Sequence, residues 1–565
     1  MTRRLVQLQA VLCFALVLLI LRLAHLQLIR GASYRRLAEQ NRLRLIPEPA
    51  PRGLITDRQG RLLASNQTIF RVALVPQDLE DVSAVVSRVS ALVHQPAESL
   101  QREYRAQRSL AFLPATIVAA VPKDVALQLE EERWRSPGLL VRPETVRRYP
   151  RGSSAAHVLG YLSQPTAEEL PMLKQYGVHP KQLVGRMGIE RVFDEVLRGR
   201  AGGVMVEVNN RGRQVRIVGR REPQAGTRIT LTIDAQLQAL IEQAFATQAG
   251  ACVVLDPTTG EVLAMTSLPA FSPEAFALSE NQTIRSYLND PEAPLMNRTA
   301  VGVYQPGSIM KLITAAAALE QHLITTSTTV TCPGSLTIGD RTFHCWNRDG
   351  HGPMTLPEAI MQSCNVYFMQ TGRKLGLAHL RTTMETAGFG RRTGWLLEEQ
   401  AGHLPQRRLT EGEVALLSIG QGEVLVTVLQ EAVVASAIAN RGWLVEPWVV
   451  KAVADRPVGH HPPSRRLGWS AQTFEAIEVG MRLVVSDPAG TGYRAMSSHV
   501  SIAGKTGTAQ THVPGQPHGW FVGFCPVDHP RVAMAIVAEH GGSGGELPAE
   551  IAKAICEYIS VVETL

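Results

Sequence analysis

The chain has 565 residues, of which 45% are hydrophobic and 19% are charged, and its net charge is +7. This composition excludes a disordered chain, and the length fits roughly two to four folded domains with sizeable cores. The positive charge permits binding to anionic surfaces such as lipid headgroups. No compact basic patch is interleaved with aromatic residues, so we do not expect the protein to bind nucleic acid.

One stretch near the N-terminus is long and apolar enough to cross a membrane. Residues 5–28 are mostly apolar, and Ala10–Leu21 is an uninterrupted apolar run. The polar residues within residues 5–28 include Gln7, Gln9, Arg22 and His25. No small-x-small cleavage site follows, so we expect a single-pass anchor rather than a cleaved signal peptide. Residues 1–4 would then form a short cytoplasmic tail.

The arginines that flank this anchor oppose the usual rule for its orientation. Positive residues normally stay on the cytoplasmic side of a membrane. Only Arg3 and Arg4 precede the anchor, whereas several follow it: Arg30, Arg35, Arg36, Arg42 and Arg44. We nevertheless expect the bulk of the chain to lie outside, because the chemistry inferred below requires an exported substrate.

Residues 29–225 are predicted to form a non-catalytic domain that serves as a pedestal, of the dimerisation type. Pro51–Ala64 is typical of a hairpin around the turn that begins at Asp57. Helical periodicity covers residues 79–106 and 123–135, a further helix is expected to end near Leu197, and a strand is expected over 204–208. No catalytic set of residues is found here, which favours a spacer and interaction platform.

Residues 226–565 have a different pattern, with strands at both ends and helices between them. Strands are predicted over residues 229–233, 251–255, 261–267, 501–508, 520–525 and 531–539. Helices are predicted from Asp234 to Ala246, over 356–369 and 411–440, and from about residue 548. This order favours an α+β domain in which an antiparallel sheet is flanked by helices.

The segment Tyr304-Gln-Pro-Gly-Ser-Ile-Met-Lys311 opens an apolar helix that continues to about Glu320. Ser308 falls in its first turn, where free backbone N–H groups and the helix dipole favour developing negative charge. Lys311 follows one turn later on the same face. A lysine in an apolar site has a lowered pKa and can accept the proton of a serine. A Ser-x-x-Lys sequence also arises by chance, so it does not identify a site alone.

Two further motifs follow in the chain: Ser363-Cys364-Asn365 and Lys505-Thr506-Gly507-Thr508. Together with Ser-x-x-Lys, in this order, they form the motif set of penicillin-binding proteins and class A β-lactamases. The alternative is that the second motif is an ordinary helix start and the third an ordinary strand end.

Each residue type in these motifs has a chemical use in acyl transfer. Ser363 would relay a proton, and Asn365 would donate its amide to a substrate carbonyl. Lys505 would supply positive charge, and the hydroxyls of Thr506 and Thr508 would bind a substrate carboxylate beside Gly507 on an edge strand.

On these residues the chain resembles the class B penicillin-binding proteins, most closely the elongation type called penicillin-binding protein 2. The resemblance covers nearly the whole chain. Its further motifs are Pro51-Arg52-Gly53 with Asp57-Arg58, Gly185-x-x-Gly188-Ile-Glu190, Thr232-Ile-Asp234, Ser418-Ile-Gly-Gln-Gly422 and His518-Gly-Trp-Phe-Val-Gly523. It implies that residues 226–565 form a transpeptidase domain with a five-stranded antiparallel sheet, like that of the serine β-lactamases.

The resemblance also implies an activity, a D,D-transpeptidase that cross-links peptidoglycan during cell-wall elongation. Ser308 would attack the D-Ala-D-Ala bond of a stem peptide, with Lys311 as base and Ser363 as proton shuttle. The backbone N–H groups of Ser308 and Thr508 would form the oxyanion hole, and β-lactams would trap Ser308. The implied partner is a membrane polymerase of the RodA type, in contact with the anchor and residues 30–225. No organic cofactor is implied.

A group of potential metal ligands lies between the first and second motifs: Cys332, Cys345, His351 and Cys364. Three thiolates and an imidazole suit a tetrahedral zinc ion, which would be structural here. Some elongation-type relatives similarly hold zinc at this place. Asp340 or Asp349 are alternative ligands. The competing interpretation is a Cys332–Cys345 disulfide, which an exported domain permits.

Two other functions compete with transpeptidation. A D,D-carboxypeptidase or β-lactamase would use the same scaffold, and in a β-lactamase Glu398 or Glu399 would activate the deacylating water. The length of the chain and its large second module argue against these hydrolases. A non-catalytic, membrane-anchored β-lactam sensor would need more cytoplasmic machinery than residues 1–4 provide.

Overall fold

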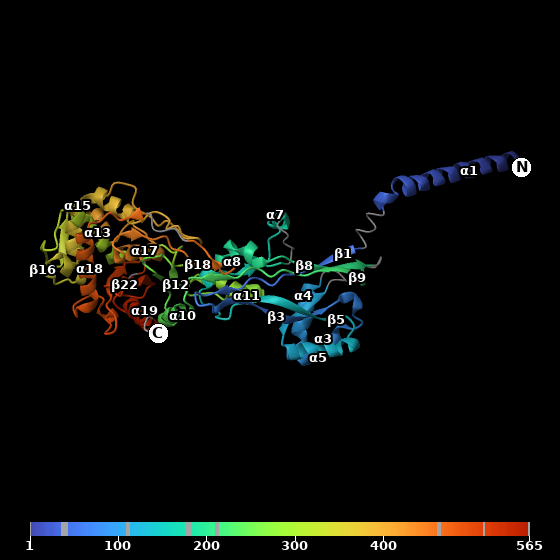
Figure 1. Cartoon of the computed structure of the whole chain (residues 1–565), viewed down its shortest axis with the longest axis horizontal. Helices are drawn as coiled ribbons and strands as arrows, with labels where there is room; N and C mark the ends of the chain where they lie inside the picture. The colour runs from blue at the N-terminus through green and yellow to red at the C-terminus, as the bar shows by residue number, and fades with distance from the viewer. Residues whose placement is uncertain are drawn as a thin grey trace. The chain divides into compact units, whose positions relative to one another are not determined.

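The computed structural model describes most of the chain, divided into two compact units. The described residues are 2–34, 43–108, 114–175, 182–208, 214–459, 465–511, 513 and 515–562 (Figure 1). Unit 1 comprises Met1–Arg52 and Arg198–Gly226, and unit 2 comprises Gly53–Leu197 and Thr227–Leu565.

The predicted apolar helix is present in unit 1. Helix α1 (Thr2–Ala24) continues as a π-helical turn, His25–Ile29. Leu5–Ile29 has a mean hydropathy of 2.3. At 1.5 Å per residue this segment exceeds the ~30 Å hydrocarbon core of a bilayer, so it is compatible with a membrane anchor.

Unit 1 also contains a three-stranded antiparallel sheet in the order β1-β8-β9. Its strands are β1 (Leu43–Glu48), β8 (Gly202–Val208) and β9 (Gln214–Arg221). Strand β8 confirms the strand predicted at 204–208. Strand β9 pairs only with β8 and therefore forms one edge of the sheet.

In unit 2, the predicted hairpin is confirmed as β2 (Ile55–Thr56) and β3 (Leu62–Leu74), which pair antiparallel. The sheet order is β19-β18-β10-β2-β3-β4, with β5 also paired to β3. The other strands are β4 (Ala115–Val121), β5 (Leu139–Arg148), β10 (Ile229–Leu231), β18 (Val450–Val453) and β19 (Arg456–Pro457). Because β10 lies beside β2, this sheet joins segments distant in the sequence.

The helices predicted within residues 79–135 cover part of this sheet. They are α3 (Val82–Val93), α4 (Ala97–Gln107) and α5 (Lys123–Glu131), the last continuing as a 3-10 turn, Glu132–Arg135. Val89 and Leu100 of these helices and Val72 of β3 share one buried cluster. Burial of these apolar side chains holds the helices on the sheet.

The motifs Pro51–Gly53 and Gly185–Glu190 meet at the buried ion pair of Arg147 and Glu190. Arg147 donates to Glu190 at 2.7 Å and to the Gly53 carbonyl at 2.6 Å, and Tyr149 donates to Glu190 at 3.2 Å. The surrounding elements are short: α6 (Ala156–Leu159), β6 (Leu162–Ser163), α7 (Leu170–Gln175), β7 (Val184–Gly185), α8 (Gly188–Val192) and α9 (Asp194–Arg198). The single helix expected here is therefore two short helices, α8 and α9.

The predicted five-stranded antiparallel sheet is confirmed, in the order β12-β11-β23-β22-β21. Its strands are β11 (Gly250–Leu255), β12 (Val262–Leu268), β21 (Ala503–Ala509), β22 (His518–Cys525) and β23 (Val532–Ala538). Helix α10 (Ala235–Phe245) begins after Asp234, whose side chain accepts from the next backbone N–H groups, as predicted. The C-terminal helix α19 (Leu547–Val562) lies with this sheet (Figure 1).

The alternation of side chains along β22 separates the two faces of this sheet. A disulfide joins Cys525 of β22 to Cys556 of α19. Trp520 of the same strand packs edge-on against Tyr304, with ring centroids 5.8 Å apart. Because Cys525 and Trp520 are an odd number of residues apart, α19 and the segment leading to Ser308 cover opposite faces.

Two of the predicted long helices are wrong. The one at 356–369 is divided into α14 (Leu356–Met361) and α15 (Asn365–Thr386), because Ser363 between them has a φ of +52°. The one at 411–440 is divided into α16 (Glu411–Leu417) and α17 (Val428–Ala439). The remaining helices are α11 (Pro273–Ala277), α12 (Asn281–Asn289), α13 (Met310–Glu320) and α18 (Ala471–Ser486).

Besides the pair of β6 and β7, the described residues form three small two-stranded sheets. They are β13 (Val330–Cys332) with β16 (Gly352–Met354), β14 (Ser335–Ile338) with β15 (Arg341–His344), and β17 (Trp443–Leu444) with β20 (Arg465–Arg466). The first two pairs lie within residues 330–354, the segment that contains Cys332, Cys345 and His351.

Glu431 of α17 provides a pH-dependent stability prediction. It is 1% exposed, neither carboxylate oxygen has a hydrogen-bond partner among the described residues, and burial raises its pKa to about 8. An unfolded glutamate ionises near 4.5. Between these two pH values the unfolded state releases the proton and the folded state keeps it. The free energy of unfolding must therefore fall as the pH rises from about 4.5 to about 8.

Glu431→Gln should therefore stabilise the protein above pH 8, by at most about 5 kcal/mol, and have little effect near pH 4.5. Thermal unfolding of both proteins at the two pH values measures this difference. An equal shift in melting temperature at both would show that Glu431 is not held protonated.

Candidate active site

Ser308 lies where the sequence predicts, in the turn that opens α13. The 3-10 turn Gly307–Ile309 leads directly into the helix, whose apolar side chains are buried. Gly307 has a φ of +56°, and a side chain there would meet the Thr508 carbonyl oxygen at 2.7 Å. Only glycine permits this close approach, which brings the Ser308 turn against β21.

Lys311 joins the first motif to the second. Its side chain is fully buried and its ammonium donates to the Ser363 carbonyl at 2.7 Å, the Ser363 hydroxyl at 3.1 Å and Asn365 Oδ1 at 2.6 Å. Burial lowers the pKa of Lys311 to about 8. The pKa is therefore lowered in the predicted direction by burial, although the ammonium itself has polar partners.

Lys505 joins the third motif to the same serine. It is fully buried, and its ammonium donates to the Ser363 hydroxyl at 2.9 Å and to the Thr506 carbonyl at 2.9 Å. Burial, together with the charge of Lys311, holds the pKa of Lys505 well below its usual value. The Ser363 hydroxyl thus lies between two buried amines that disfavour each other's protonation.

The left-handed conformation of Ser363 explains this arrangement. It interrupts the helical path between α14 and α15, so that the hydroxyl contacts both lysines. Asn365 is the first residue of α15, and its side-chain amide also donates to the His344 carbonyl at 3.3 Å. In this structure both ends of the Asn365 amide are held by the protein.

Strand β21 presents the third motif on the edge of the five-stranded sheet. Lys505, Thr506 and Gly507 are buried, whereas the Thr508 side chain is exposed. The Thr506 hydroxyl lies 2.6 Å from that of Thr491. Strand β21 is the last strand of this sheet among the described residues, so its outer edge presents backbone groups to an extended peptide.

A loop between α16 and α17 supports the Ser308 turn. Gly420 accepts from the Gly307 N–H at 2.9 Å, and its own φ is +73°. A side chain at Gly420 would meet the Gly307 carbonyl oxygen at 2.0 Å. Gln421 donates to the Thr508 carbonyl at 3.3 Å, so the loop contacts both the nucleophile turn and β21.

Gly420 and Gln421 are residues of the site that the sequence motifs did not predict. The signal was the pair of glycines, Gly420 and Gly422, within an otherwise helical pattern, since such glycines commonly mark a break or a close backbone approach.

The four predicted metal ligands converge. One ligand atom from each lies within 4.8 Å of all the others: Cys332, Cys345, His351 and Cys364. His351 Nδ1 is 3.5 Å from the Sγ atoms of both Cys332 and Cys345. Neither Asp340 nor Asp349 belongs to this group within the part of the chain that the structure describes.

The chemistry of this group suits a metal ion. The three thiols are buried and unpaired, so the alternative Cys332–Cys345 disulfide is not formed. Hydrogen bonds from Cys364 and from the backbone N–H of Asn365 lower the pKa of Cys345, which favours the thiolate that binds metals. Three sulfurs and one imidazole match a closed tetrahedral site.

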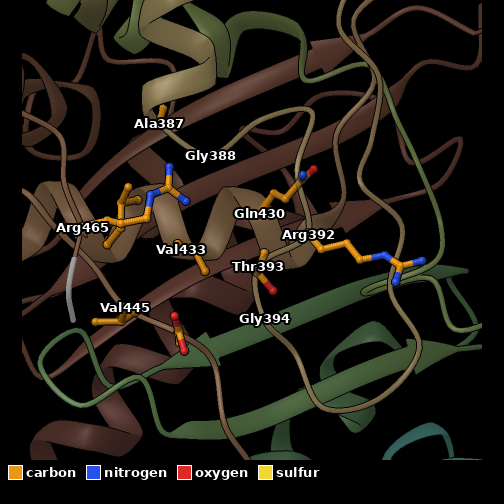
Figure 2. A pocket seen from close by; sticks show the side chains of 11 residues that line it. Ala387, Gly388, Arg392, Thr393, Gly394, Gln430, Val433, Val445 and Arg465 are labelled. Carbon is orange, nitrogen blue, oxygen red and sulfur yellow. The ribbon is translucent and has the colours of Figure 1, made fainter. Parts of the chain in front are cut away.

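The two glutamates considered as deacylating bases are engaged elsewhere. Glu398 pairs with Arg191 at 2.7 Å. Glu399 accepts from the backbone and hydroxyl of Thr393 at 2.9 and 2.8 Å and from the Gly394 N–H at 3.1 Å. Thr393 and Gly394 line a pocket of about 170 Å³ with Arg392, Arg465 and Gln430 (Figure 2). None of the three motifs contributes to that pocket.

Comparison with known families and proteins agrees with this geometry. The family model described as the penicillin binding protein transpeptidase domain matches residues 250–557, and that of the penicillin-binding protein dimerisation domain matches residues 47–231. The peptidoglycan D,D-transpeptidase MrdA of Acinetobacter baumannii is 31% identical, over 96% of this chain and 85% of its own length. MrdA of Escherichia coli K12 is also 31% identical, over 93% and 89%.

Solved structures are similar over nearly the whole length. A penicillin-binding protein (PBP2) of Helicobacter pylori in complex with MreC has a TM-score of 0.77 at 27% identity, covering 93% of this chain and 99% of its own. A chain from a peptidoglycan synthase complex that coordinates polymerization and crosslinking has a TM-score of 0.74 at 31% identity, covering 98% of both. The chain therefore belongs to the penicillin-binding protein transpeptidases, within the peptidoglycan D,D-transpeptidases of the PBP2 type.

Proposed function

We propose that Ser308 is the nucleophile of this D,D-transpeptidase and that it forms an acyl-enzyme with the donor stem peptide during cell-wall elongation. The observation that supports this most directly is the Ser363 hydroxyl, which accepts from both Lys311 and Lys505. A serine at a helix start, a buried amine one turn later and a hydroxyl that bridges two amines are the groups that such a proton transfer requires.

The acylation step follows from this arrangement. Neutral Lys311 accepts the Ser308 proton as Oγ attacks the penultimate D-alanine carbonyl, and the bond to the terminal D-alanine breaks. The backbone N–H groups of Ser308 and Thr508 stabilise the negative charge on the carbonyl oxygen. The proton passes through Ser363 to the leaving amine. In the second step the amine of a neighbouring stem peptide attacks the ester and releases Ser308.

The third motif binds the donor. The stem peptide lies along the free edge of β21, where Gly507 leaves room for its backbone. The hydroxyls of Thr506 and Thr508 bind the terminal carboxylate, near the positive charge that Lys505 shares with Lys311. Asn365 donates to a substrate carbonyl when its bond to the His344 carbonyl is exchanged. β-Lactams follow the same path and remain on Ser308.

We further propose that zinc occupies the cysteine and histidine cluster. Cys332, Cys345, His351 and Cys364 would hold it in a closed tetrahedron, and the ion would serve structure rather than chemistry. Cys364 stands between Ser363 and Asn365, so the ion would fix the second motif in place.

We place the chain in the bacterial cytoplasmic membrane as a single-pass protein with its catalytic domain outside. Residues 5–28 are the anchor, 29–225 the non-catalytic pedestal and 226–565 the transpeptidase domain. The Cys525–Cys556 disulfide supports an oxidising compartment. The partner is a membrane polymerase of the RodA type. Its support is the structural similarity to a chain of a synthase complex that coordinates polymerization and crosslinking.

Labelling with a fluorescent penicillin tests the proposed nucleophile. The full-length protein should form a covalent adduct that survives a long chase with unlabelled drug, and Ser308→Ala should form none. An adduct that clears within minutes would instead indicate a hydrolase. Labelling of Ser308→Ala at the wild-type level would show that another residue is acylated.

A further inference from the structure

The charge of this protein is concentrated in one of its two units. Unit 1 contains sixteen arginines, no lysine and four glutamates, a net charge of +12. Because the whole chain carries +7, unit 2 carries −5. Excess positive charge in unit 1 favours an anionic partner there rather than on the net-negative unit 2.

Part of this charge lies on an exposed strand. Arg216 and Arg220 of β9 are 68% and 56% exposed. Arg221 is the last residue of β9. Arg200 pairs with Gln224, three residues beyond Arg221, and so lies near the end of the strand. Arg216 pairs with Glu207, and Arg220 with Glu48 and Glu222. Arg200 and Arg221 have no acidic partner within the residues that the structure describes.

The same strand exposes aliphatic side chains between its arginines. Ile217 is 61% exposed and Val218 is 46% exposed. Val206 of β8 opposes Ile217 and Met205 opposes Gly219, so Val218 is an extra residue that bulges from the ladder. We call Arg200, Arg216, Ile217, Val218, Arg220 and Arg221 the β9 surface. Guanidinium groups beside exposed aliphatic side chains are typical of surfaces that rest on a membrane interface.

The chain tethers this surface to the anchor. Only residues 30–42 separate the end of the apolar helix at Ile29 from β1, and a fully extended segment of that length reaches at most about 45 Å. Strand β1 pairs with β8, which pairs with β9. If α1 crosses the membrane as proposed above, the β9 surface remains within reach of the lipid headgroups.

We propose that the β9 surface binds the anionic phospholipids of the leaflet on the catalytic side of the membrane. The guanidinium groups donate paired hydrogen bonds to lipid phosphates, and Ile217 and Val218 enter the interface. A bilayer is a better candidate than an acidic protein, because an anchored chain keeps the β9 surface close to the membrane through residues 30–42.

The test uses the full-length protein in nanodiscs of phosphatidylcholine alone or mixed with phosphatidylglycerol. Hydrogen exchange of residues 214–221 should be slower by at least about tenfold in the anionic discs, given several arginines at a charged surface. High salt should remove this protection from the unaltered protein. The variant R200Q/R216Q/R220Q/R221Q should also lose it, whereas R102Q/R105Q/R285Q/R408Q, which removes the same charge from unit 2, should keep it.

The outcomes separate this inference from the function on which it rests. Fluorescent penicillin reports whether each variant is folded. Protein that fails to incorporate into discs would overturn both the anchor and the lipid contact. Incorporated protein with exchange independent of lipid charge would overturn the lipid contact alone. Protection that appears only when another protein is added would assign the β9 surface to an acidic protein partner instead.

Discussion

Lys311→Met should reduce the rate of penicillin acylation by at least about 10³-fold, since it removes the proposed general base. Methionine is similar in length to lysine and tolerates a buried site, so the fold should persist. The variant should lose acylation while its thermal unfolding stays close to that of the wild type. Stopped-flow or gel measurements of the acylation rate, with circular dichroism for folding, check this.

The pH dependence of the acylation rate provides a second test of Lys311 as the base. Lys311 accepts a proton only when neutral, and its pKa is lowered to about 8. The wild-type acylation rate should therefore rise with pH through about 8 and then level off, and Lys311→Met should lack this inflection. A wild-type rate that falls over the same range, or a variant that acylates normally, would rule out Lys311 as the base.

If zinc occupies the cysteine and histidine cluster as proposed, its removal should have the second large effect, on stability. Structural zinc contributes roughly 10 kcal/mol or more to the folding of small zinc domains, so chelation should lower the melting temperature by at least about 10 °C. Cys345→Ala should have the same effect and also reduce penicillin labelling, because the second motif would lose its support. Elemental analysis should find one zinc per chain.

Cys252→Ala is the matched control, because Cys252 is a buried free cysteine outside the cluster. It should retain its zinc and lose only the modest stability of a small cavity, about 1 kcal/mol. Protein without metal, in which mass spectrometry finds Cys332 bonded to Cys345, would establish the disulfide interpretation instead.

Much of the fold and the candidate site follows from local sequence. The Ser308 motif, the Asp234 helix cap and the strands of the five-stranded sheet depend on neighbouring residues, so their patterns predict them directly. The convergence of the three motifs was predicted from resemblance, because no local rule brings Lys505 to Ser363.

The errors occurred where distant contacts override local preference. Apolar periodicity continues through Ser363, yet its backbone turns to the left-handed region so that the hydroxyl contacts Lys311 and Lys505. Likewise Gly420 ends a helical pattern because the Ser308 turn occupies the space beside it. The pairing of β1 with β8 and the Cys525–Cys556 bond join segments whose pairing a single sequence does not determine.

Two groups of cysteines in this chain require opposite redox conditions. Cys525 and Cys556 need an oxidant to form the disulfide that joins α19 to β22. Cys332, Cys345 and Cys364 must stay reduced to bind the proposed zinc ion. A thiol reductant that keeps the cluster cysteines reduced will also reduce the Cys525–Cys556 disulfide. An oxidant that forms this disulfide can also oxidise the cluster cysteines until a metal binds them. Protein made in a reducing compartment should therefore differ from protein made in an oxidising one in how firmly α19 is attached to β22.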